Sequence, residues 1–192
     1  MAVTPRRMTL AEFLELPEIK PARELRNGVV SQKMPPSGPH GSIQLWFGAQ
    51  VYNHAELHEI AQAFTETRVI LGEDTYVPDV VVYSWDSVPE DENGRLPFYF
   101  TTPPDLAVEV ASPGQTLRSL LERCRELVGH GVRVVVLVDP ERLGVHVFRA
   151  DGEIGPLREG DAVDITDVLP GFELTVSDLL ARIHPSRSRR RS

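Results

Sequence analysis

Residues 106–128 read LAVEVASPGQTLRSLLERCRELV, and this stretch decides the fold. An apolar strand with one carboxylate, Glu109, is followed by a Ser-Pro-Gly break and then by an amphipathic helix. Burying an ionised carboxylate costs several kcal/mol unless a cation or hydrogen-bond donors compensate it. Glu109 is therefore the first candidate functional residue.

The helix after the break carries an apolar stripe at helical spacing. The stripe consists of Leu117, Leu120, Leu121, Cys124, Leu127 and Val128. Thr116 is the expected N-cap, and Arg123 lies about 100° from the stripe centre. Two interpretations of Arg123 stay open: it reaches back toward Glu109, or it forms surface pairs with Glu122 or Glu126.

The strand 77–83 holds a second carboxylate, Asp79, inside an apolar run. Alternation places Asp79 on one face with Val81 and Tyr83. If this strand neighbours the strand of Glu109, the two acids converge on one hard divalent cation such as Mg²⁺. In the alternative, each acid sits at a frayed strand end or meets an arginine.

The composition is that of a soluble globular protein of 192 residues, and we expect one domain over residues 1–184. One cysteine and no apolar run of bilayer length lead us to expect a cytoplasmic protein that does not enter membranes. The net charge of -8 argues against a uniformly cationic surface for phosphates. It still allows a local basic groove beside acidic metal ligands.

Local signals predict the other elements. Thr9 and Glu12 have capping-box spacing for a helix over 10–16, and Asn27-Gly28 predicts a β-hairpin. The expected remainder is a helix over 41–58, two short strands or one bent strand over 61–71, an irregular region over 85–104, strands over 132–138 and 145–149, extended pieces over 165–169 and 172–174, and a helix over 177–183.

Several segments occur in a telling order: EL-x-NG-VV, P-SGPH, V-PDVVV, PPDLAVEVASP, VVVLVDP and LPGFEL. In this order they resemble the Uma-type family of restriction endonucleases, in the PD-(D/E)XK nuclease superfamily, from about Met8 to Leu180. The resemblance implies an α/β (α+β) fold: a mixed central sheet flanked by helices, with an N-terminal helix and hairpin. It also implies a DNA endonuclease, with homodimerisation expected by analogy because two strands are cut.

The resemblance assigns roles to individual residues. Asp79 and Glu109, with the backbone carbonyl of Val110, are the implied ligands of Mg²⁺, for which Mn²⁺ can substitute. Glu24 is the acid before the hairpin, which ligates the metal directly or through water. His40 matches a histidine at the start of the second helix, where it contacts phosphate; alternatively it caps that helix or binds solvent.

One position departs from the family pattern. The simplest enzymes of the superfamily place lysine two residues after the acid, where this chain has Ala111; many Uma-type members place it on the next helix, where Arg123 aligns. An arginine stays protonated, so Arg123 can orient water or stabilise charge but cannot act as a base. We expect reduced or absent cleavage, and the alternative is a catalytically inactive nuclease fold that binds nucleic acid or a protein partner.

Two further features carry less weight. His54 and His58 are four residues apart on the expected helix, but a pair without a third ligand is a weak metal site, so we expect solvent-exposed histidines. The tail over residues 185–192, with Arg187 to Arg191, is expected to be disordered, and its charge either adds affinity for phosphates or has no role.

Overall fold

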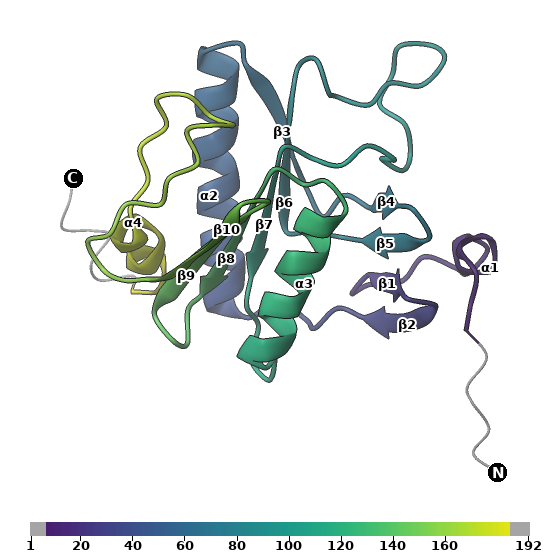
Figure 1. Ribbon diagram of the computed structural model, residues 1–192, viewed down its shortest axis with the longest axis horizontal. Coiled ribbons are helices and arrows are strands. Elements are labelled where there is room, and N and C mark those ends of the chain that lie inside the picture. The colour runs from purple at the N-terminus through teal and green to yellow at the C-terminus, as the bar shows by residue number, and fades with distance from the viewer. Residues whose placement is uncertain (1–6, 185–192) are drawn as a thin grey trace.

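The computed structural model describes residues 7–184, and the predicted basic tail lies outside them (Figure 1). The helices are α1 (Leu10–Leu14), α2 (Gly38–Leu57), α3 (Leu117–Gly129), α4 (Val176–Leu180) and the short 3₁₀ helix η1 (Ala181–Ile183). The strands are β1 (Arg23–Arg26), β2 (Val29–Gln32), β3 (Ala61–Thr65), β4 (Val69–Leu71), β5 (Asp74–Tyr76), β6 (Val80–Ser84), β7 (Leu106–Val110), β8 (Val134–Asp139), β9 (Gly144–Arg149) and β10 (Gly152–Leu157).

The core of the fold is a six-stranded sheet in the order β10-β9-β8-β7-β6-β3. Only β7 and β8 pair in parallel, and α3 connects them. Every residue of β7 is buried, as expected for a strand covered on both faces. Figure 1 shows α2 and α3 on opposite faces of this sheet; Phe47 of α2 belongs to the same core cluster as Val108, and Leu127 of α3 belongs to the other cluster with Ala107.

A second, four-stranded sheet in the order β2-β1-β5-β4 lies beside the first and carries the predicted hairpin. Asn27 and Gly28 have φ of 50° and 73°, the left-handed conformations that a two-residue hairpin loop requires. The capping box of Thr9 and Glu12 is also present, although α1 ends at Leu14. The predicted N-terminal helix and hairpin are therefore confirmed.

The strand predicted over 77–83 is wrong in its start. The chain forms β5 up to Tyr76, breaks at Val77-Pro78-Asp79, and resumes as β6 at Val80. Proline has no N–H for a ladder hydrogen bond, which accounts for the break. Asp79 therefore lies at the entrance of β6, and its backbone N–H donates to Val108 O at 3.1 Å.

The C-terminal part departs most from expectation. The apolar pieces over 165–169 and 172–174 form turns and irregular chain, although Ile165, Leu169 and Leu174 are buried. Strand β10 was not predicted, because its sequence GEIGPL is exposed and has no apolar alternation. The last helix begins one residue early, at Val176, and ends as η1.

Helix α2 begins at Gly38, three residues before the predicted start, because Ser37 caps it and accepts from His40 N at 3.3 Å. The predicted cap of α3, Thr116, is confirmed. Within the described residues, no helix is long and apolar enough to cross a membrane.

We expect Phe47→Ala to lower the free energy of unfolding by about 3–5 kcal/mol, because it removes a fully buried ring of α2 from the core. Leu45→Ala is the matched control on the same helix: Leu45 is 75% exposed, so its change should stay within about 0.5 kcal/mol. Urea unfolding monitored by circular dichroism measures both. Equal losses would contradict the assigned face of α2.

Candidate active site

The two predicted acids lie close together, Asp79 at the entrance of β6 and Glu109 on the adjacent strand β7. Strands β6 and β7 pair antiparallel, with Val80 opposite Val108 and Val81 opposite Ala107, and Glu109 follows Val108 on β7 while Asp79 directly precedes Val80. Both side chains line one cavity of about 210 Å³. The two strands are therefore neighbours in one sheet, as the convergence of the two acids requires.

Asp79 is saturated by donors from three parts of the chain. Its Oδ2 accepts from the backbone N–H of Val110 at 2.7 Å, and its Oδ1 accepts from Lys33 Nζ at 2.7 Å. His40 Nε2 lies 3.4 Å from the same Oδ1. Burial would raise the pKa of Asp79, but the hydrogen bond from His40 and the charge of Lys33 outweigh it and lower the pKa to about 2. Asp79 is therefore ionised at neutral pH.

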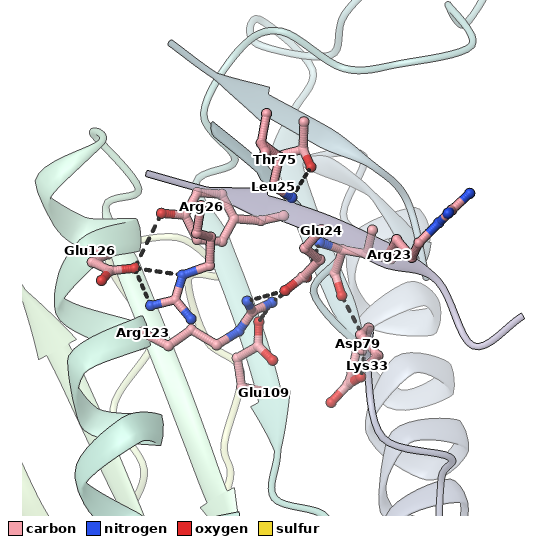
Figure 2. A network of polar contacts seen from close by, with 12 residues as sticks. Arg23, Glu24, Leu25, Arg26, Lys33, Thr75, Asp79, Glu109, Arg123 and Glu126 are labelled. Carbon is pink, nitrogen blue, oxygen red and sulfur yellow. Dashed lines mark hydrogen bonds and ion pairs between the residues drawn. The ribbon is translucent and has the colours of Figure 1, made fainter. Parts of the chain in front are cut away.

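Arg123 is buried between Glu24 and Glu109 (Figure 2). Its Nη1 and Nη2 donate to the two oxygens of Glu24 at 2.6 and 2.8 Å, and Nη2 lies 2.9 Å from Glu109 Oε1. The guanidinium carbon also lies 5.3 Å from the centre of the Tyr76 ring. Of the two interpretations of Arg123, the contact with Glu109 is the one observed, and Glu126 pairs instead with Arg26.

Both carboxylate oxygens of Glu24 accept hydrogen bonds. Besides Arg123, its Oε1 accepts from the backbone N–H of Val77 at 2.6 Å. Glu24 thereby joins the hairpin to the segment before Asp79 and holds Arg123 in place. Its predicted role as a metal ligand stays a prediction.

Glu109 has the least satisfied carboxylate of the site. The contact with Arg123 is a close ion pair that lacks hydrogen-bond geometry, and Oε1 is buried without a hydrogen-bond donor. Burial raises the pKa of Glu109 to about 7, against the opposing effect of Arg123 and with a further increase from Asp79. A buried acceptor without a donor is costly, so Glu109 is the residue that most needs a cation.

His40 lies between Ser112 and Asp79 in this structure. It is buried, with Nδ1 3.0 Å from Ser112 Oγ and Nε2 close to Asp79. Burial would lower its pKa, but the Asp79 carboxylate outweighs this effect and the pKa is raised. The alternatives in which His40 caps α2 or binds solvent are wrong, since Ser37 is the cap and the ring is buried. The contact with phosphate stays a prediction.

Lys33 is the site residue that sequence reasoning missed. Its ammonium donates to Asp79 Oδ1 and, at 2.8 Å, to Val77 O, and it lies 3.4 Å from Glu66 Oε1. The resemblance directed attention to Ala111 and Arg123, and Lys33 lies far before both in the chain. The hairpin register contained the signal: Glu24 pairs with Ser31, and Lys33 N bonds Ala22 O, so Glu24 and Lys33 lie on the same face.

Of the pair His54 and His58, His54 has a packing role. His54 Nε2 lies 2.9 Å from Pro170 O, and its ring stands edge-on to Phe172. His58 is exposed, as expected, but His54 is half-buried. Across residues 7–184, no group of three or more His, Cys, Asp or Glu side chains is close enough to hold a metal alone.

The mixed sheet, the flanking helices and the acid pair define a restriction-endonuclease-like α+β protein. The Uma2 family model, described as "Putative restriction endonuclease", matches residues 10–177, and the chain belongs to this family. A crystal structure from Anabaena variabilis ATCC 29413, described as a putative nuclease, is 32% identical, with a TM-score of 0.86, covering 92% of this chain and 99% of the other. A comparison with curated proteins found no match.

We expect Arg123→Met to lower the free energy of unfolding by about 3–5 kcal/mol, because it leaves two buried carboxylates without their shared cation. Arg123→Lys keeps the charge but not the bidentate fork, so it should fall between Met and the wild type. Arg118→Met, at an 89% exposed side chain of the same helix, should cost about 0.5 kcal/mol or less. Urea unfolding that ranks Arg123→Met with Arg118→Met would contradict the buried contact.

The raised pKa of Glu109 predicts a pH effect in metal-free protein. Between its ordinary value of 4.5 and about 7, the folded state holds a proton that the unfolded state has lost. The wild type should therefore lose stability relative to Glu109→Gln as pH rises through this window, by at most about 1.4 kcal/mol per pH unit. Unfolding titrations in EDTA measure it, and parallel curves would exclude the shift.

Proposed function

We propose that this protein is a metal-dependent endonuclease that hydrolyses DNA phosphodiester bonds. The observation that carries the proposal is the placement of Asp79, at the entrance of β6, and Glu109, on the adjacent strand β7, along one cavity. The family description and the similar structure support a nuclease. Dimerisation, which would present one site to each strand of a duplex, belongs to the same proposal.

The residues present fit Mg²⁺, or Mn²⁺ as its substitute. Carboxylate and carbonyl oxygens are the ligands that these ions prefer, and Glu109 Oε1 is a buried oxygen without a donor. Asp79, Glu109 and the Val110 carbonyl would hold the ion. Because they do not form a complete cage, waters and the substrate phosphate would complete it, as is usual for Mg²⁺. Bound there, the ion would polarise the phosphate and lower the pKa of a water molecule.

The chain's own side chains supply positive charge and order. Lys33 is placed to stabilise negative charge that develops on the phosphate, since its ammonium is held beside Asp79 by two acceptors. It provides the lysine that α3 lacks. Arg123 is committed to Glu24 and Glu109, so it orients Glu109 rather than contacting the phosphate.

A specific observation favours a second candidate, a catalytically inactive nuclease fold that binds nucleic acid or a protein partner. Lys33 already neutralises Asp79, and Arg123 already lies against Glu109. Two acids compensated by protein cations need no metal for stability. The two candidates differ in whether a divalent ion binds and displaces Lys33 from Asp79.

Cleavage of supercoiled and linear DNA in Mg²⁺, Mn²⁺ or EDTA tests the first candidate. We expect metal-dependent cleavage that falls by about 100-fold or more in Asp79→Asn and Glu109→Gln. Lys33→Met should lose about 10- to 100-fold. Arg149→Met, which removes a cation of β9 paired with Asp167, should cleave like the wild type.

Cleavage that survives both acid substitutions would refute the assignment. Calorimetric titration with Mn²⁺ separates the candidates when no cleavage is seen. Heat that vanishes in Glu109→Gln would support a metal site, and the absence of heat in the wild type would support the inactive fold.

A further inference from the structure

Three hollows, together called the groove here, share lining residues from the acid pair to the loop between β6 and β7. A hollow of about 400 Å³ shares Lys33, His40 and Asp79 with the site cavity. It shares Lys20, Ala22 and Glu66 with a larger hollow of about 740 Å³. The three hollows are thus neighbours, and the largest of the three lies within the size range of small-molecule sites, about 300–1,000 Å³.

The far wall of the groove is aromatic and open to solvent. Phe98 is 81% exposed and belongs to the long loop between β6 and β7 (Figure 1). Tyr99 stands edge-on to it, with ring centres 4.7 Å apart. Leu96, also on this wall, is 48% exposed. Phe98 therefore presents a free aromatic ring to whatever occupies the groove.

This wall is held in place by β4. Ile70 N donates to Phe100 O at 2.7 Å, and Phe100 N donates to Arg68 O at 3.0 Å. The Arg68 guanidinium lies 5.9 Å from the centre of the Tyr99 ring. A ring on an anchored segment loses little conformational freedom when a ligand stacks on it, which favours binding.

The charges of the groove suit a phosphate-bearing strand. Of its two acids outside the site, Glu18 accepts from Arg68 at 3.0 Å, and Glu66 lies 3.4 Å from Lys33, which also pairs with Asp79. Lys20 is an exposed cation where the two larger hollows meet. Proteins that hold single strands combine such cations with rings on which bases stack.

We propose that the groove binds an unpaired nucleobase, stacked on Phe98, of the strand whose phosphate lies at Asp79 and Glu109. The preferred substrate is then single-stranded or locally unpaired DNA, since a base inside a duplex does not expose its face. The placement of the strand's phosphate at Asp79 and Glu109 rests on the proposed function, whereas the stacking of a base on Phe98 does not.

Fluorescence anisotropy of a short labelled single strand, in EDTA at fixed low salt, tests the stacking with the full chain. Phe98→Ala should weaken binding by about 5- to 150-fold, the range that one stacked base contributes. Ile154→Ala is the matched control, because it removes a 57% exposed apolar side chain on β10. Strand β10 is one edge of the large sheet, and β3 is the other. Ile154→Ala should bind like the wild type, and an abasic strand should erase the effect of Phe98→Ala.

Three results would overturn the groove: no binding of the single strand, tighter binding of a duplex, or equal affinities of Phe98→Ala and Ile154→Ala. Phe98-dependent binding without cleavage in Mg²⁺ would support the groove and refute the nuclease. Cleavage that Phe98→Ala leaves unchanged, with unchanged binding, would refute the groove and leave the nuclease standing.

Discussion

The buried guanidinium of Arg123 is the interaction on which the site depends. It joins Glu24 of the hairpin to Glu109 of the central sheet from a position on α3. Three segments distant in sequence are thereby held at one point. A buried ion pair seldom adds stability over well-packed apolar groups, so its value here is to fix positions.

The two acids of the site are held in different electrostatic states. Asp79 has donors at both oxygens and a lowered pKa. Glu109 has a raised pKa, and its ion pair with Arg123 lacks hydrogen-bond geometry. Such a pair, separated in pKa and facing a cavity, is typical of functional sites. A divalent cation would remove the imbalance, because it attracts both carboxylates at once. This is the physical link between the observed geometry and the proposed chemistry.

Local signals predicted most of the fold. The turn at Asn27-Gly28 and the caps at Thr9 and Thr116 act within a few residues, so they are readable without tertiary contacts. Strand β10 is an exposed edge strand without an apolar pattern, so it lacked such a signal. The apolar run near Ile165 is buried by packing against the core but does not form a strand.

The site residues that follow strand alternation could be predicted from the sequence. Those that depend on contacts between distant segments could not. Asp79 and Glu109 stood out as carboxylates in apolar runs. Lys33 did not, because its distance from the acids is set by how the hairpin packs against Val77 and Asp79. The two hydrogen bonds from Arg123 to Glu24 could not be predicted either, since 99 residues separate the two residues in sequence.

The central claim is that Asp79 and Glu109 form a divalent cation site that Lys33 adjoins. A crystal structure of the wild type grown with Mn²⁺ tests it most directly, through anomalous scattering. We predict a peak in contact with both carboxylates, with Lys33 Nζ displaced from its position 2.7 Å from Asp79 Oδ1. A map without a peak, with Lys33 still bonded to Asp79, would contradict it.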